Sequence, residues 1–383
     1  MPPEFNNMLI KCHSHIVEDH ACDTLRAGEG SIVALRDGRI LLLYSRFGGP
    51  GDADSAVVMR RMSSDSGESW SEPSMEFTAP AGALNIMSIS LLRLQDGRIA
   101  CLYLVKWSGE RSIPVFLSSK DEGTTWSKPQ AITEKPEYYT VNNDRLIQSR
   151  DGTLVVPYAR WARQGDDLEE RGNMPCGIFF SRDGGVTWQQ SGHEIRHTPE
   201  IFQPPQFIDH NLLDEGLRKQ LREKRCIVQE PGVVELRDGR LMLYMRSVWS
   251  IIRCFAASVD APWEQAGPLE GFHVCCGPQT IRREPVSGAL VMLYNDRGTI
   301  PWPRGEFALR TPLSVASSRD EGRSWQRRGQ LQTEEKNYCY CSLLFHQGNF
   351  IASYYESGIH QDKPGRRNLA SLKVACGHSA ALV

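Results

Sequence analysis

Ser119-Lys120-Asp121-Glu122-Gly123-Thr124-Thr125-Trp126 is one copy of a pattern, Ser-x-Asp-x-Gly-x-x-Trp, that recurs along this chain of 383 residues. Complete copies begin at Ser63, Ser119, Ser181 and Ser318, and a decayed copy keeps Ser258, Asp260 and Trp263. Recurrence of one pattern indicates a repeat architecture, in which every repeat is a supersecondary unit. The fold therefore depends on the repeat and not on any single segment.

Each copy has the composition of a tight turn. Its Asp carboxylate is suited to accept backbone N–H bonds inside the turn, and its Gly is suited to a positive φ. We expect the Trp ring to pack between adjacent sheets, with the indole N–H free to donate. These copies are therefore expected to be structural and not to contact a substrate.

A second repeat alternates with the first and consists of an apolar strand, a short turn of the Asp-Gly type and another apolar strand. The predicted hairpins cover residues 31–46, 88–104, 145–158, 231–246, 279–294 and 341–355. The first five precede the five Ser-x-Asp copies in order. Six repeats of about four strands each predict an all-β fold, a six-bladed β-propeller.

The domain organisation follows from the same repeats. We expect one propeller domain over residues 1–383, with an insertion around 198–224 that contains a short helix at 212–224. Residues 163–173 are polar and are expected to form an exposed loop. Residues 368–375 are expected to supply a strand that closes the ring near the N-terminus.

The composition excludes several function classes. A net charge of −2 provides no field that would recruit nucleic acid or an anionic membrane. No apolar run approaches the ~20 residues that span a bilayer, and no signal peptide is evident, so a cytoplasmic location is expected. The 11 cysteines include no Cys-x-x-Cys pair, which favours reduced, mostly buried thiols over a metal site. No cofactor is expected, and the oligomeric state stays open.

The repeated pattern is the Asp-box, and with it the chain resembles the sialidase (neuraminidase) superfamily, as a divergent bacterial-type member with BNR-type repeats. The resemblance covers nearly all of the chain. In this family a strand begins with a general-base Glu, and the strand paired with it ends with an Arg. Gln229-Glu230-Pro231-Gly232 is similar to the first of these segments, and Tyr244-Met245-Arg246-Ser247 is similar to the second. The resemblance therefore implies that Glu230 is the base and that Arg246 holds a substrate carboxylate.

The remaining catalytic roles come from the same resemblance. Tyr340 matches the nucleophilic tyrosine, with Tyr338 as its rival, and Arg310 matches a second carboxylate-binding arginine. The loop after the first hairpin carries the acid/base Asp in this family, and Asp52 is nearest to that position, with Asp54 second.

These residue types suit one reaction. A tyrosine hydroxyl with its ordinary pKa of ~10 is a weak nucleophile at neutral pH, and a carboxylate within hydrogen-bonding reach is able to take its proton. Arginine binds a carboxylate through two parallel hydrogen bonds. A neutral tyrosine also avoids the repulsion that a carboxylate nucleophile would feel beside an anionic sugar.

The first hairpin departs from the family pattern. The family's third carboxylate-binding arginine aligns with Gly28, and Glu29 stands beside it. Arg26 lies two residues away on the same strand face, but we assign it no role. Glu29 is expected to bind a sugar hydroxyl or a cation instead.

Four other polar residues are expected to line the substrate site. Arg145 is expected to face the channel and partly to replace the missing arginine, with Asp144 beside it. Asn85 holds the same position at the second hairpin, and Arg46 ends the first hairpin as Arg246 ends the fourth. The substrate-binding set is therefore Arg246, Arg310, Arg145, Glu29, Arg46, Asp144 and Asn85.

The resemblance implies a sialidase-like exo-glycoside hydrolase that removes a terminal acidic sugar, sialic acid or a related one, from a glycan. One alternative is a propeller glycosidase or lyase that acts on another sugar, such as a uronic acid or a deoxysugar, which the Gly28–Glu29 departure favours. The other is a non-catalytic carbohydrate-binding propeller.

Overall fold

The computed structural model describes residues 8–20, 25–161, 174–195, 228–247, 250–275, 277–296, 310–358 and 369–383. These residues form β-strands and one short 3-10 helix, η3 (Ser379–Leu382), which confirms the all-β prediction. Within them no helix is long and apolar enough to span a membrane. The insertion expected around 198–224, with its helix, and the loop expected at 163–173 lie outside the described residues.

Three antiparallel sheets of four strands each follow the chain in order. One contains β6 (Asn85–Arg93), β7 (Ile99–Lys106), β8 (Ser112–Ser119) and β9 (Gln130–Ala131). The next contains β15 (Gln229–Glu235), β16 (Leu241–Arg246), β17 (Ile251–Ala256) and β18 (Gly267–Pro268). The last contains β19 (Thr280–Arg283), β20 (Leu290–Tyr294), β21 (Leu313–Ser318) and β22 (Gln326–Gln332).

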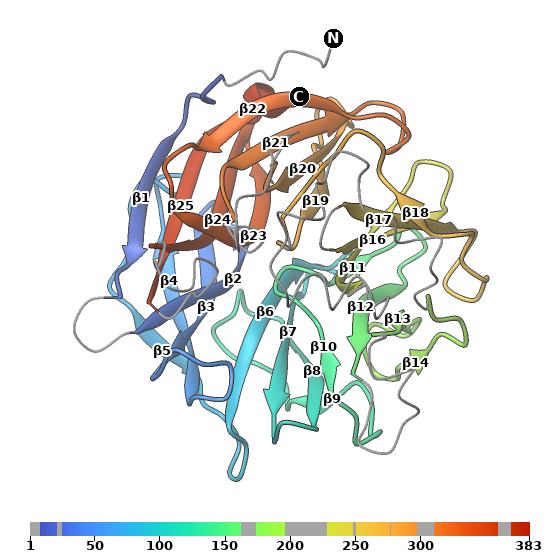
Figure 1. Ribbon diagram of the computed structural model, residues 1–383. Helices are drawn as coiled ribbons and strands as arrows, with labels where there is room; N and C mark the ends of the chain where they lie inside the picture. Colours follow the sequence, from blue (N-terminus) through green and yellow to red (C-terminus); the bar gives the residue numbers. More distant parts are fainter. Residues whose placement is uncertain are drawn as a thin grey trace, which may run out of the picture.

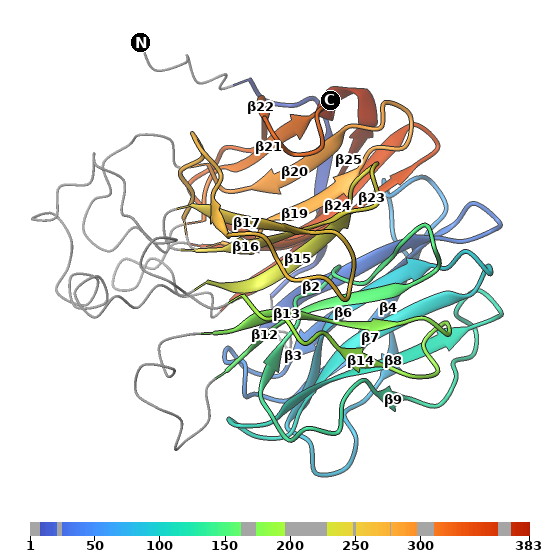
Figure 2. The same ribbon diagram turned by 90° about the vertical axis from the view of Figure 1, so that its right-hand side faces the viewer.

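Two larger sheets complete the described structure. A five-stranded sheet holds β10 (Tyr139–Thr140), β11 (Ile147–Gln148), β12 (Leu154–Arg160), β13 (Cys176–Ser181) and β14 (Gln189–Gln190). An eight-stranded sheet holds β1 (His13–Glu18), β2 (Arg26–Ala34), β3 (Ile40–Phe47), β4 (Ala56–Ser63), β5 (Ser74–Phe77), β23 (Asn337–His346), β24 (Asn349–Ser357) and β25 (Ala370–His378). Figure 1 shows the sheets arranged around a centre, with β2, β6, β19 and β23 close to it, and Figure 2 gives the side view.

The chain ends meet in the eight-stranded sheet, as predicted. β25 pairs with β1 and β24 in antiparallel fashion and with β2 through one parallel pair, Arg26 with Ala370. That single pair joins two runs of strands into one sheet. All six predicted hairpins are present, as β2–β3, β6–β7, β11–β12, β15–β16, β19–β20 and β23–β24. Because two of them share one sheet, the described strands form five hydrogen-bonded sheets, and the count of six blades stays a prediction.

The Asp-boxes are built as their composition predicts. In the second copy the Ser119 hydroxyl donates to Asp121 at 2.7 Å and accepts the Gly123 N–H at 2.8 Å, and Asp121 accepts the Thr125 N–H at 2.8 Å. Gly123 has φ of 78°, a conformation that a glycine adopts without strain. The Trp126 ring packs against the core cluster between two sheets and donates to Glu76 at 2.5 Å.

The core lies between neighbouring sheets. Val155 and Ile178 of one sheet, for example, pack with Leu243 and Cys254 of the next. Each sheet thus buries its faces against its neighbours, which is how a sheet with two apolar faces becomes stable. Of the eight cysteines that the structure describes, all but Cys12 are buried.

Candidate active site

The innermost strands deliver side chains to the centre through one repeated device. The pairing register shifts at a β-bulge near the start of β2, β6, β15 and β23. At these bulges Glu29, Ser88, Glu230 and Tyr340 have φ values of 51°, 60°, 49° and 56°, and Asp144, just before β11, has 58°. A bulge re-aims a side chain, and a non-glycine residue with positive φ is strained, a feature that clusters at functional sites. Two of the predicted catalytic residues are among these five.

Tyr340 and Glu230 are hydrogen-bonded, as the sequence led us to expect. The Tyr340 hydroxyl donates to Glu230 Oε1 at 3.0 Å, although 110 residues separate the two. The other oxygen, Oε2, lies 2.6 Å from Arg246 Nη1. Gln229, with its amide oxygen facing Arg246, accepts from Nε at 3.2 Å and from Nη2 at 2.5 Å. Glu230 and Arg246 are both buried, so the tyrosine is bound to a carboxylate that is itself held in place.

Arg310 places a second guanidinium beside the tyrosine. Its Cζ lies 5.5 Å from the centroid of the Tyr340 ring, and the residue is 5% exposed. Within the described part of the chain its Nη1 has no hydrogen-bond partner. Burial acts to lower the pKa of Arg310, but nearby Cys339 and Tyr340 outweigh it and raise the pKa above its ordinary value. A buried cation whose Nη1 is not bonded is a natural receptor for an anionic ligand.

Arg26, to which the sequence analysis gave no role, lies at the centre of a second group. Its Nη2 donates to Glu29 at 2.6 Å, its Nη1 to Asp52 at 2.5 Å and its Nε to the Tyr355 hydroxyl at 2.8 Å. The Tyr355 ring in turn packs edge-on against the Tyr340 ring, with centroids 5.6 Å apart. Asp52 is thereby linked to Tyr340 through two intermediate residues, Arg26 and Tyr355. The sequence feature that could have pointed to Arg26 was its spacing of two residues from Gly28, which keeps it on the same strand face.

Glu29 is satisfied by protein groups. Its Oε1 accepts from Arg26, and its Oε2 accepts the Ser88 hydroxyl at 2.7 Å. The residue is only 2% exposed. The structure therefore uses the acid beside Gly28 to neutralise Arg26, whereas the sequence suggested that it would contact a sugar or a cation.

The loop that carries Asp52 is anchored through its backbone. Asn85 donates from one amide nitrogen to the carbonyls of Asp52 and Asp54, at 2.9 and 2.8 Å, and Lys106 donates to the Asp52 carbonyl at 3.0 Å. The Asp54 carboxylate binds within the loop itself, where it accepts the Gly51 N–H at 2.6 Å. Asp52 is thus the loop acid that faces the cluster, and Asn85 is bound to the loop.

Three predicted substrate contacts are bound elsewhere in the protein. Arg145 is buried and donates to the Gln279 carbonyl at 2.6 Å. Asp144 accepts the Ser31 hydroxyl at 3.0 Å and pairs with Arg282, while Arg46 pairs with Glu18. None of these described contacts joins them to the Tyr340–Glu230 pair. Asp144 and Arg145 thus join the segment before β11 to β2 and to the start of β19, and Arg46 joins β3 to β1.

Among the described residues no group of three or more His, Cys, Asp or Glu is arranged to hold a metal ion. The cluster consists of a hydroxyl, three carboxylates and three guanidiniums: Tyr340, Glu230, Asp52, Glu29, Arg246, Arg310 and Arg26. Such a set is able to move protons and to bind an anion.

Residues 100–352 match the model of the BNR repeat-like domain. The chain belongs to that family. It is 26% identical over 258 residues to a protein of Bacteroides fragilis (strain YCH46) named sialidase, a match that covers 64% of this chain and 39% of that protein. The chain thus spans about two fifths of the length of this relative.

Solved structures show that this member of the BNR repeat-like family has the sialidase fold. The Hadza microbial sialidase Hz136 superposes with a TM-score of 0.69 at 17% identity, over 97% of this chain and 69% of that one. Trypanosoma rangeli sialidase in complex with sialic acid gives 0.66 at 14% identity, over 94% and 55%. A protein of unknown function from Dyadobacter fermentans DSM 18053 gives 0.65 at 16% identity, over 95% and 98%.

Proposed function

We propose that the chain is a sialidase-like exo-glycoside hydrolase that removes a terminal acidic sugar from a glycan. The observation that carries this proposal is the 3.0 Å hydrogen bond from Tyr340 to Glu230, with the buried Arg310 guanidinium beside the same ring. The name of the Bacteroides fragilis relative and the sialic acid bound in the Trypanosoma rangeli structure support the same reaction class.

The reaction would proceed by double displacement. Glu230 accepts the phenolic proton while the Tyr340 oxygen bonds to the anomeric carbon and the glycosidic C–O bond breaks. Asp52 protonates the departing oxygen. Water, deprotonated by Asp52, then attacks the anomeric carbon, and the Tyr340 oxygen leaves and recovers its proton from Glu230. Arg246 and Arg310 lower the energy of the phenolate that develops.

The substrate anion would bind mainly at Arg310. Arg246 already faces Glu230, and Arg26 already faces Glu29 and Asp52. The family's third arginine is therefore replaced by a neutralised one. We expect the loss to weaken carboxylate binding by ~1.5–3 kcal/mol, the range of a hydrogen bond to a charged group.

The Arg26–Glu29 pair also favours a second candidate, the same reaction on a terminal uronic acid. A uronic acid presents its carboxylate on a different ring carbon from sialic acid, so a site in which Arg310 is the main anion receptor and the third arginine position is closed suits it better. Release from fluorogenic glycosides distinguishes the two candidates.

The test compares the wild type with Tyr340→Phe on a fluorogenic sialoside and a fluorogenic glucuronide. We expect release from one of them, and a loss of at least 10³-fold in kcat when the hydroxyl is removed. Unchanged circular dichroism would show that the variant folds. Turnover by Tyr340→Phe at the wild-type rate would refute the assignment, and glycan binding without release would support a non-catalytic propeller.

A further inference from the structure

The decayed Asp-box differs from the intact copies around its tryptophan. Pro262 stands where the intact copies have glycine, and Trp263 comes two residues earlier than the tryptophan of the intact copies. The Trp263 indole N–H donates to the carbonyl of His193 in the neighbouring sheet region at 3.3 Å. The ring is partly buried and packs against the core cluster that contains Val155 and Leu243.

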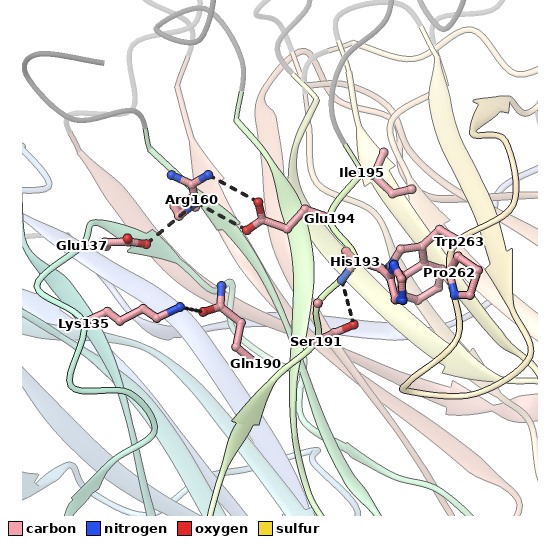
Figure 3. A pocket seen from close by; sticks show the side chains of 11 residues that line it. Lys135, Glu137, Arg160, Gln190, Ser191, His193, Glu194, Ile195, Pro262 and Trp263 are labelled. Carbon is pink, nitrogen blue, oxygen red and sulfur yellow. Dashed lines mark hydrogen bonds and ion pairs between the residues drawn. The ribbon is translucent and has the colours of Figure 1, made fainter. Parts of the chain in front are cut away.

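Trp263 lines a cavity of about 720 Å³ whose other walls come from the segment before β10, from the end of β12, and from β14 with the residues that follow it. Figure 3 shows the cavity with two unlike sides. Ile195, Pro262 and Trp263 form an apolar side, and Lys135, Glu137, Arg160 and Glu194 form a charged side. A cavity of this size lies in the range of small-molecule sites.

The charged side is held rigid by its own contacts. Arg160 Nη2 lies 3.3 Å from Glu194, and Arg160 Nε lies 3.8 Å from Glu137. The Tyr158 hydroxyl donates to Glu194 at 2.9 Å, and Lys135 donates to Gln190 at 2.6 Å. Two carboxylates face two cations, so the wall offers donors and acceptors without an excess of either charge.

This combination selects the chemistry of a ligand. A charged ligand would lie at similar distances from the two cations and the two carboxylates of this wall. Attraction and repulsion would then nearly cancel, so the wall gives a charged ligand little net attraction. A sugar ring has an apolar C–H face that packs on an aromatic ring and a rim of hydroxyls that both donate and accept. The cavity lining provides both parts, the Trp263 ring and the balanced polar wall.

We propose that this cavity is a second carbohydrate site, which binds a neutral sugar unit between Trp263 and the Arg160–Glu194 wall. It lies on strands apart from β15 and β23, which carry Glu230 and Tyr340. The site needs no catalysis at the central cluster, so it stands whether or not the proposed hydrolase activity is found.

The test is saturation-transfer NMR and calorimetry with lactose and N-acetylglucosamine as probes. We expect the wild type to bind one of them with a dissociation constant on the order of 1 mM. Trp263→Ala should weaken binding at least tenfold, and Trp263→Phe should restore most of it. Trp161→Ala is the matched control, because Trp161 is an exposed tryptophan beside the same sheet that does not line the cavity.

Further variants keep the test decisive. If Trp263→Ala fails to fold, Glu194→Gln takes its place, and we expect it to weaken binding several-fold. Tyr340→Phe should bind the sugars as the wild type does. Absence of binding, equal binding by Trp263→Ala, or loss of binding in Tyr340→Phe would each overturn the proposal.

Discussion

Arg26 and Asp52 form an ion pair with 2.5 Å between Nη1 and Oδ1, although one is buried at the start of β2 and the other is exposed in the loop between β3 and β4. The Arg26 guanidinium also stacks on Phe47, with Cζ 3.9 Å from the ring centroid. The arginine is therefore fixed, and it fixes the acid.

Replacing Arg26 by Met tests what this pair does. Met keeps much of the packing on Phe47 and removes the charge. We expect kcat to fall about tenfold, and the basic limb of the pH–rate profile to move to higher pH, because a lost cation disfavours the ionised carboxylate of Asp52. The measurement is kcat and KM from pH 4 to 9. Arg39→Met, in an exposed pair with Asp37, should leave both unchanged.

Glu230→Gln tests the proton acceptor. The amide still accepts a hydrogen bond from Tyr340 but cannot take its proton, so we expect kcat to fall roughly 10²- to 10⁴-fold with little change in KM. Glu235→Gln, at the other end of β15, is the control, because Glu235 contacts Arg150. An equal loss in the two variants would argue against a role for Glu230 in proton transfer.

Arg310→Lys tests the anion site. Its backbone contacts with Asn295 and Asn337 do not depend on the guanidinium, so the fold should persist. We expect an unsaturated sialic acid analogue, or the uronic acid counterpart, to bind about tenfold more weakly, because lysine cannot form the paired bonds of a guanidinium. Calorimetry measures this, and undiminished binding would place the carboxylate elsewhere.

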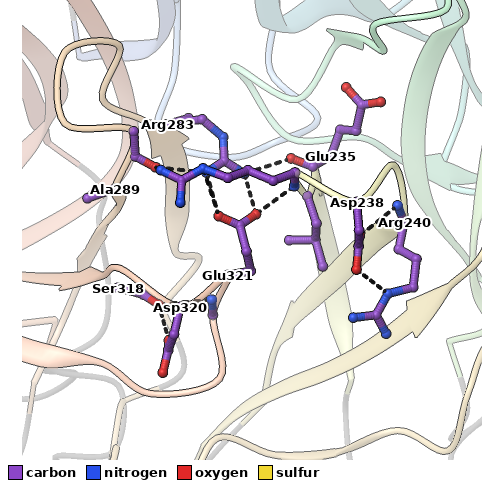
Figure 4. A network of polar contacts seen from close by, with 12 residues as sticks. Glu235, Asp238, Arg240, Arg283, Ala289, Ser318, Asp320 and Glu321 are labelled. Carbon is purple, nitrogen blue, oxygen red and sulfur yellow. Dashed lines mark hydrogen bonds and ion pairs between the residues drawn. The ribbon is translucent and has the colours of Figure 1, made fainter.

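Glu321, in the last Asp-box, is expected to contribute to the stability of the fold. Glu321 accepts from Arg283 Nη2 and from the Arg237 N–H, both at 2.7 Å, and so joins the turn of the fourth hairpin to the fifth. Figure 4 shows it between Arg283 and the turn that carries Asp238 and Arg240. Partial burial alone would raise the pKa of Glu321, but the bonds from Arg283 lower it below its usual range.

Glu321→Ala should therefore lower the free energy of unfolding by about 1–3 kcal/mol, because it removes charged hydrogen bonds between two hairpins. Asp238→Ala removes an exposed pair with Arg240 and should cost about 0.5 kcal/mol or less. Urea denaturation of the two variants gives the comparison. Equal costs would show that the contact between hairpins adds nothing.

Acid should weaken the Asp-boxes. Hydrogen bonds from the hydroxyl and N–H of Thr125 lower the pKa of Asp121 to about 2. Because the folded pKa lies below the unfolded value of about 3.9, the stabilisation is complete above that value and is lost as pH falls through 2. Asp121→Asn should lower Tm at pH 7, and the difference from wild type should shrink at pH 2. A constant difference would contradict the assignment.

The sequence alone was sufficient for the repeat and its turns. The hydrogen bonds of an Asp-box join residues at most four apart, and a hairpin needs its turn and its alternating strands, so both are written in consecutive residues. The resemblance to the sialidase superfamily led us to expect the pairing of Tyr340 with Glu230, and both stand at the same point of a repeated hairpin. The expectation for Arg310 came from the resemblance to the sialidase superfamily.

Only the tertiary structure decided which charges cancel. Arg26 and Glu29 were set aside or misjudged because their partners, Asp52, Ser88 and Tyr355, come from other strands and loops. Arg145 looked like a channel residue, but packing directs its guanidinium to the Gln279 carbonyl. An ion pair across strands depends on bulges and on the approach of separate hairpins, and neither is encoded at the residue that bears the charge.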